Sequence, residues 1–134
     1  MTEPARRAFP GCPDQVARAR QFVADELAGC PVSDGAVLCV SELATNALTH
    51  TASGDGGKFE VVVQRWLSLA RVSVRDEGSQ ESPEARPLDL VSESGRGLGL
   101  VALVADRWGE SGDGDGRVIW FEMGWASQPS TAGA

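Results

Sequence analysis

One helix, expected from Ser33 to Thr51, constrains the fold more than any other stretch of this chain. Its apolar residues recur at spacings of three and four, which places them in a single stripe along the helix. Glu42 and Asn46 are four residues apart, so their side chains leave one helix face beside the stripe, roughly 5–6 Å from each other. A helix buried along this stripe would hold a carboxylate and a carboxamide at the edge of a pocket. A solvated polar edge on a core helix would produce the same pattern. The stripe consists of Val37, Val40, Leu43, Ala44, Ala47 and Leu48.

The order of the expected elements predicts an α+β two-layer sandwich, with three helices on one face of a mostly antiparallel sheet. It lacks the strand–helix alternation of a Rossmann fold. The third helix is apolar nearly all round, so we expect it to be buried. We expect one domain over residues 12–125, after an N-terminal segment at 1–11 and before a disordered tail at 126–134. The other expected helices are Pro13–Gly29 and the third helix, Leu98–Asp106. An edge strand is expected at Arg6–Phe9, a first hairpin at Lys58–Trp66 with Leu69–Asp76, and a second hairpin at Trp108–Gly112 with Arg117–Met123.

The composition bounds the class of protein. The formal net charge of −7 over 134 residues disfavours nucleic acid and anionic membranes as direct partners. No apolar run of transmembrane length and no signal-peptide pattern occurs, so we expect a cytoplasmic protein. His50 is the only histidine, and the three cysteines lack C-x-x-C spacing, which argues against a Cys/His metal cluster and a disulfide framework.

A second polar cluster, Asp76 to Gly78, follows the second strand of the first hairpin. An ionised carboxylate only accepts hydrogen bonds, so Asp76 would favour the amino group of adenine over the carbonyl of guanine. Gly78 would let the backbone lie close to a flat base. An aspartate that leaves a strand into a glycine turn is also a common structural device.

A third cluster, Gly95 to Leu100, opens the third helix. Its glycines allow close approach of the backbone, and a helix N-terminus offers free N–H groups to phosphate. Arg96 adds a guanidinium that suits phosphate oxygens. A helix start with flexible glycines is the structural alternative. The spacing is not G-x-G-x-x-G, and the only lysine, Lys58, is followed by Phe59 where a P-loop requires serine or threonine.

The three clusters occur in the order Glu42-x-x-x-Asn46, Asp76-x-Gly78, and Gly95-Arg96-Gly97-Leu98-Gly99. In this order they resemble the N, G1 and G2 boxes of the ATPase and kinase superfamily that includes gyrase and the histidine kinases (the GHKL superfamily, with its Bergerat-type fold). The resemblance covers residues 12–124. The Gly-Arg-Gly-Leu sequence and the small size look most like the anti-sigma-factor serine/threonine kinases.

The resemblance implies roles for individual residues. Asn46 would bind ATP through Mg²⁺, which it would ligate with its side-chain oxygen. Glu42 would be the general base on a serine hydroxyl or on a water. Asp76 would read adenine, with Gly78 beneath the base, and Ser79–Ser94 would form the ATP lid. The remaining residues that would bind the nucleotide are Gly95, Arg96, Gly97, Leu98 and Gly99.

The implied function is that of an ATP-binding regulator. The leading hypothesis is a Mg-ATP-dependent serine/threonine kinase that restrains a sigma factor and phosphorylates an anti-sigma-factor antagonist. Its partners would be ATP or ADP and these two proteins, and kinases of the resembling family are often homodimers. One alternative is a non-catalytic module in which nucleotide switches a binding surface, because the lid is short and only Arg96 and Arg86 could neutralise a γ-phosphate. Another is the catalytic domain of a histidine kinase. His50 could be a site residue or a cation at a helix C-terminus.

Overall fold

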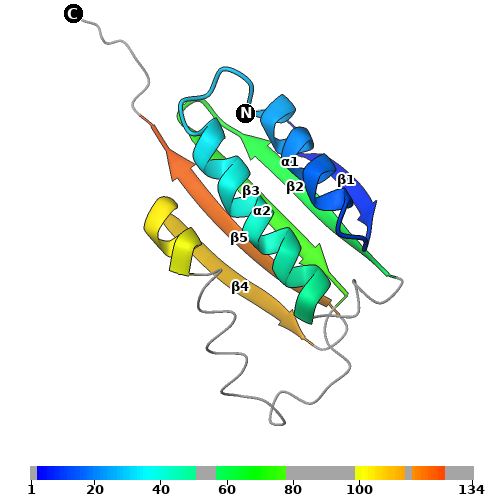
Figure 1. Ribbon diagram of the computed structural model, residues 1–134. Helices are drawn as coiled ribbons and strands as arrows, with labels where there is room; N and C mark the ends of the chain where they lie inside the picture. Colours follow the sequence, from blue (N-terminus) through cyan, green and yellow to red (C-terminus); the bar gives the residue numbers. More distant parts are fainter. Residues whose placement is uncertain (1–2, 51–56, 78–98, 114–115, 126–134) are drawn as a thin grey trace, which may run out of the picture.

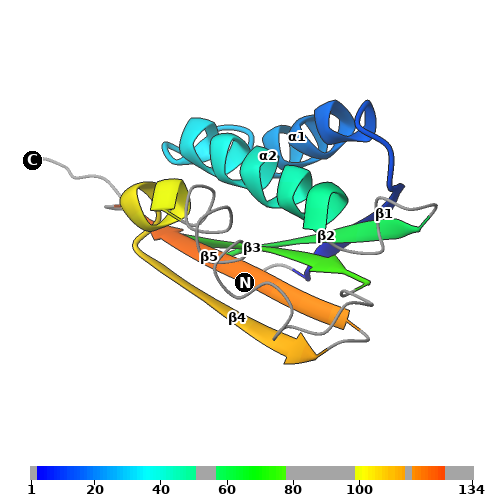
Figure 2. The ribbon, with the colours of Figure 1, turned by 60° about the horizontal axis from the view of Figure 1, so that its bottom comes forward.

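The computed structural model describes residues 3–50, 57–77, 99–113 and 116–125. Two helices and a sheet form two layers, with the helices on one face of the sheet (Figures 1 and 2). A further helical segment covers residues 99–104 on the same face. The bounds of the named elements are β1 Ala5–Pro10, α1 Gln15–Glu26, α2 Ser33–His50, β2 Lys58–Arg65, β3 Leu69–Asp76, β4 Arg107–Asp113 and β5 Gly116–Gly124. The predicted α+β sandwich is confirmed.

Within the described ranges, the sheet has five strands in the order β1-β2-β3-β5-β4, and every neighbouring pair is antiparallel. β1 lies at one edge, as the sequence predicts, and β4 lies at the other. β5 is inserted between β3 and β4, so the last strand of the described residues is next to the middle of the sheet. This arrangement places the end of β3 beside the start of β5, with Asp76 opposite Arg117.

The core lies between α2 and the covered face of the sheet. Leu43, Ala44 and Ala47 of the α2 stripe are at most 1% exposed. On β3, alternate residues face them, and Ala70, Val72 and Val74 are buried. The stripe therefore packs against the covered face of the sheet, as its spacing predicts.

The first helix is shorter than predicted. It begins at Gln15 and ends at Glu26, whereas the pattern predicted Pro13–Gly29. Gly29 has a φ of 84°, a backbone conformation that favours glycine, and it lies in the turn that follows the helix. The chain thus turns at Gly29, three residues beyond the last residue of the helix.

The prediction that the third helix is buried nearly all round is wrong for the described part. Leu103 is 84% exposed, and only Val101 is buried between residues 99 and 104. The helix also ends before Asp106, which instead accepts a hydrogen bond from the Gly124 N–H at 2.7 Å. Leu103 is exposed because the third helix lies beside α2 at the margin of the helical layer, where this helix meets the core along one side. Its Val104 packs so close to Gly35 that a Cβ there would lie 3.1 Å from Val104 Cγ1.

Among the helices of the described ranges, none combines the length and the apolar character that crossing a membrane requires.

Candidate functional site

Asp76 occupies a position that the strand pattern assigns to the core. Residues 70, 72 and 74 of β3 are buried and apolar, and Asp76 continues this row as its last member. It is 4% exposed, and the row runs beneath the helical layer. A carboxylate at the end of an apolar row loses its hydration, so it requires compensating polar partners.

Arg117 is one of the polar partners of Asp76. Its Nε and Nη2 atoms lie 3.3 and 3.2 Å from Oδ2 of Asp76, and both donate hydrogen bonds to this oxygen. The same guanidinium reaches Glu110 on β4, where Nη1 lies 3.6 Å from Oε2. Three strands are therefore joined at this end of the sheet by one arginine between two carboxylates.

Glu42 and Asn46 lie on α2 above the sheet. Both are half-buried, and the helix continues beyond them to His50. Leu43 and Ala47, their neighbours in the stripe, are buried and fix the rotation of the helix. The C-terminal half of α2 and the end of β3 lie at the same end of the molecule (Figure 1). The structure thus brings both α2 residues and Asp76 to one end of the fold.

The charge of Glu42 affects the pKa of a buried thiol on the same helix. Burial and, to a lesser extent, the charge of Glu42 raise the pKa of the Cys39 thiol from 9.0 to about 11. Cys39 is fully buried and remains a neutral thiol near neutral pH. It is therefore not a nucleophile.

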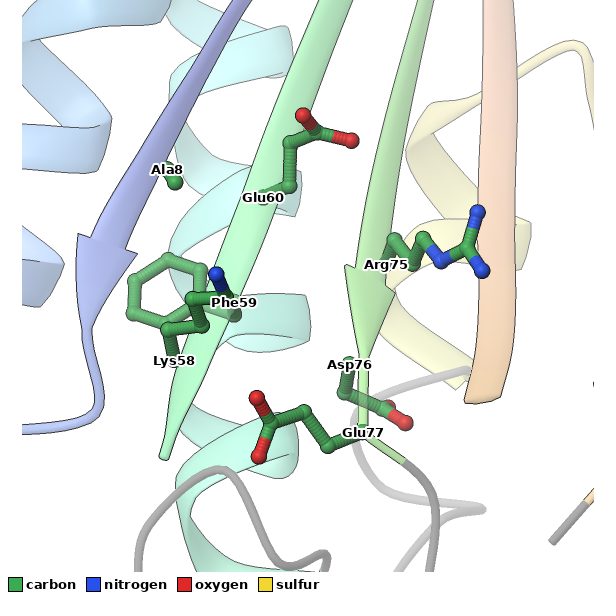
Figure 3. A pocket seen from close by; sticks show the side chains of 7 residues that line it. All are labelled: Ala8, Lys58, Phe59, Glu60, Arg75, Asp76 and Glu77. Carbon is green, nitrogen blue, oxygen red and sulfur yellow. The ribbon is translucent and has the colours of Figure 1, made fainter. Parts of the chain in front are cut away.

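A shallow pocket of about 200 Å³ lies at the end of β2 and β3. Figure 3 shows Glu60 and Arg75 on the face of the sheet that the helices do not cover. Lys58 and Glu77 line the same pocket, so its rim is charged. Asp76 also lines this pocket, but the pocket opens on the uncovered face, and it is not the pocket between sheet and helices that the sequence predicts.

Several predicted site residues lie outside the described residues. Gly99 is the first described residue of the third helix, and a Cβ there would meet nothing within 4 Å. The lid segment Ser79–Ser94 and the side chain of His50 are not part of the described structure. The other predicted residues in this group are Gly78, Gly95, Arg96, Gly97 and Leu98. Their roles stay predictions.

The sequence was then compared with families of known proteins. It matches the family described as the histidine kinase-like ATPase domain over residues 9–123. The chain belongs to this family. A comparison with curated proteins found none that matches. The match begins in β1 and ends in β5, so the whole two-layer fold is that of a histidine kinase-like ATPase domain.

Membership of the histidine kinase-like ATPases supports binding of ATP or ADP. Within the described ranges, no group of three or more His, Cys, Asp and Glu side chains could hold a metal ion. A magnesium ion that arrives with nucleotide phosphates requires only one or two protein ligands, because phosphates and waters supply the rest. The side-chain oxygen of Asn46, half-buried at the site end of α2, fits this requirement.

Arg117 is the site residue that the sequence motifs do not contain. The sequence of β5 nevertheless contains a signal for Arg117. On β5, Ile119, Phe121 and Met123 alternate toward the core, and Arg117 is the charged residue at the start of this row. A charged residue in an apolar row on one strand predicts an opposite charge on a neighbouring strand. In this histidine kinase-like ATPase domain, that opposite charge is Asp76.

Proposed function

We propose that this chain binds Mg-ATP and transfers the γ-phosphate to a serine or threonine of a separate protein. The family supports ATP or ADP binding. One observation carries the proposal further. The buried carboxylate of Asp76 lies at the same end of the fold as the half-buried Glu42 and Asn46 of α2. This is the arrangement expected if one residue reads the base and two others act near the phosphates.

Each residue has a chemical role in this proposal. Asp76 accepts a hydrogen bond from the amino group of adenine. Asn46 ligates the magnesium ion, which neutralises phosphate charge when it is bound. Glu42 accepts the proton of the incoming hydroxyl group. Phosphoryl transfer depends mostly on positioning and charge neutralisation, so a rigid α2 on a packed core is a suitable support for it.

The proposed protein partners come from the sequence resemblance. The Gly-Arg-Gly-Leu sequence of residues 95–98 resembles that of the anti-sigma-factor kinases. We therefore extend the proposal to a regulator that restrains a sigma factor and phosphorylates a small antagonist of anti-sigma factors. This finer assignment is supported by sequence similarity, whereas the ATP site is also supported by the fold.

A transfer experiment tests the kinase proposal. The purified chain is incubated with Mg²⁺, γ-labelled ATP and a candidate antagonist, and label on the antagonist is measured. Glu42→Gln should lower the rate roughly 10²–10⁴-fold, the usual contribution of a general base. Glu26→Gln, an exposed glutamate at the end of α1, is the matched control and should transfer normally. Normal transfer by Glu42→Gln would remove Glu42 from the mechanism.

A non-catalytic ATP-dependent switch is the second candidate. The sequence favours it, because the segment Ser79–Ser94 that would form the lid is short and only Arg96 and Arg86 could neutralise a γ-phosphate. Saturable ATP binding without transfer to any acceptor, together with ATP-dependent capture of the partner, would support the switch over the kinase.

A further inference from the structure

We propose that Arg117 fixes the orientation of the Asp76 carboxylate and so sets the preference of the site for a 6-aminopurine. This inference rests on the proposed nucleotide site. It adds a positioning residue from β5, outside the three sequence motifs. The observation behind it is the pair of contacts from one guanidinium to a single oxygen of a buried carboxylate.

The ion pair is fully buried at the carboxylate and partly buried at the guanidinium. The Asp76 side chain is 2% exposed and the Arg117 side chain is 22% exposed. A buried charge of this kind is costly unless an opposite charge and hydrogen bonds compensate it. The Arg117 guanidinium provides this compensation through its positive charge and its N–H donors. The carboxylate can therefore be held at the end of an apolar row.

The geometry of these contacts also restricts rotation of the Asp76 carboxylate. The last bond of an aspartate side chain normally allows a broad range of angles. Here two N–H groups of a planar guanidinium contact Oδ2, while Glu110 contacts the Nη1 atom of the same guanidinium. Strand register places Arg117 directly opposite Asp76, so the backbone supports the contact. Rotation of the carboxylate would break both hydrogen bonds.

A fixed carboxylate discriminates between purines more sharply than a rotating one. Its two oxygens offer about four acceptor positions, and both Arg117 contacts are made to Oδ2. An acceptor held toward position 6 of the base attracts an amino group and repels a carbonyl. A carboxylate that can turn aside admits a water, which can donate to a carbonyl or accept from an amino group equally well. Loss of Arg117 should therefore reduce selectivity.

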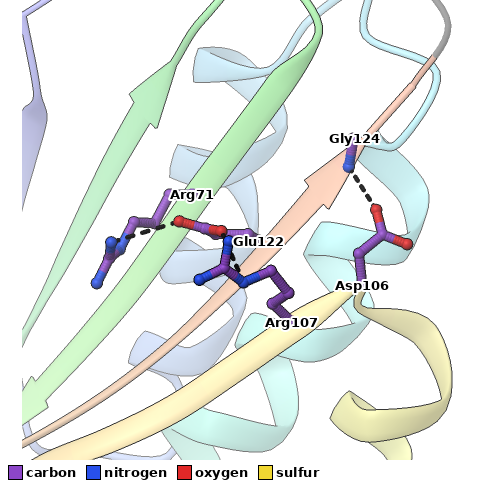
Figure 4. A network of polar contacts seen from close by, with 5 residues as sticks. All are labelled: Arg71, Asp106, Arg107, Glu122 and Gly124. Atoms are coloured by element: carbon purple, nitrogen blue, oxygen red, sulfur yellow. Dashed lines mark hydrogen bonds and ion pairs between the residues drawn. The ribbon is translucent and has the colours of Figure 1, made fainter.

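The sheet offers a matched control. Arg71 on β3 pairs with the buried Glu122 on β5, with Nη1 3.4 Å from Oε2 (Figure 4). This pair joins the same two strands, but it lies on the uncovered face, where the Arg71 guanidinium also stacks over Trp120. An effect that is general to arginine–carboxylate pairs in this sheet would appear in both variants. An effect specific to the base-reading carboxylate would appear only at Arg117.

The experiment measures binding of ATP and of inosine triphosphate, which carries a carbonyl in place of the 6-amino group. Calorimetry with Mg²⁺ is carried out on the wild-type chain and on Arg117→Lys, Arg117→Gln and Arg71→Gln. We expect the preference for ATP to fall roughly tenfold in Arg117→Gln, the effect of losing one well-placed hydrogen bond to a charged group. Arg117→Lys keeps the charge without the planar double contact, so it should fold and still lose selectivity.

The outcomes separate this inference from the proposed function. Binding by the wild-type chain, with reduced selectivity in Arg117→Lys and wild-type selectivity in Arg71→Gln, supports the positioning role. Binding with unchanged selectivity in Arg117→Lys overturns that role and leaves the nucleotide site intact. Equal losses in the Arg117 and Arg71 variants also overturn it. A wild-type chain that binds neither nucleotide overturns the proposed function itself, and the inference with it.

Discussion

Two glycines with positive φ angles allow a sharp prediction about the strand that holds Arg117. Gly112 near the end of β4 has a φ of 112°, and Gly29 after α1 has a φ of 84°. A Cβ at Gly112 would lie 2.2 Å from the carbonyl oxygen of Gly116 and 2.7 Å from Cα of Arg117. A Cβ at Gly29 would meet nothing within 4 Å. The two sites therefore separate backbone strain from steric overlap.

The magnitudes follow from these distances. Alanine at Gly29 should lower the free energy of unfolding only by the strain of a left-handed backbone, about 1–2 kcal/mol. Alanine at Gly112 pays at least this strain, because a φ of 112° lies beyond the small left-handed region near 60°. It also overlaps backbone atoms that cannot rotate away, which adds about 1–3 kcal/mol, the usual cost of overpacking. We expect Gly112→Ala to lower the free energy of unfolding by about 2–5 kcal/mol.

Urea denaturation of the two variants measures both costs, provided that the slope with denaturant is unchanged. Gly112 is opposite Arg117 in the β4–β5 register, so Gly112→Ala should also weaken ATP binding, whereas Gly29→Ala should not. Equal destabilisation by the two variants would refute the steric reasoning. Normal ATP binding by a folded Gly112→Ala variant would refute the link between this hairpin and the site.

Two further predictions concern α2. Leu43→Ala should lower the free energy of unfolding by about 2–5 kcal/mol, because Leu43 is 1% exposed. Leu38→Ala on the same helix should change it by less than about 0.5 kcal/mol, because Leu38 is 45% exposed. Equal effects of the two variants in urea denaturation would contradict the packing of the stripe. The pKa of Cys39, raised from 9.0 to about 11, means that the folded state holds the thiol proton more tightly, so its stabilising contribution is complete below pH 9 and is lost as the pH rises to 11. The free energy of unfolding, measured across this pH range, should fall more steeply in the wild-type chain than in Cys39→Ala. Parallel curves for the two proteins would contradict a raised pKa of Cys39.

Much of the fold follows from local patterns. The α2 stripe and the alternation in β3 each predict which side of an element is buried, because side-chain direction has a fixed period in helices and strands. Turn residues also place the hairpins correctly, with β4 and β5 within one residue of the predicted ends. These features depend on neighbours in the chain, so the sequence alone contains them.

Other features depend on distant parts of the chain. The insertion of β5 beside β3 is a pairing between strands far apart in sequence, and it decides that Asp76 meets Arg117. The exposure of Leu103 depends on where the third helix lies at the margin of its layer. For the site, the sequence predicted Asp76, Glu42 and Asn46 at one place, but it did not predict the arginine that holds the first of them.

The central claim is that Asp76 forms part of a purine nucleotide site on the helical side of the sheet. Calorimetric titration of ATP with Mg²⁺ into the wild-type chain, Asp76→Asn and Glu60→Gln tests it most directly. Asp76 also lines the pocket on the uncovered face, and Glu60 is a half-buried carboxylate of that pocket, so Glu60→Gln shows whether nucleotide binds there instead. We predict saturable binding that Asp76→Asn weakens roughly tenfold or more and Glu60→Gln leaves unchanged. Absence of binding to the wild-type chain, or binding that Asp76→Asn does not weaken, would contradict the claim.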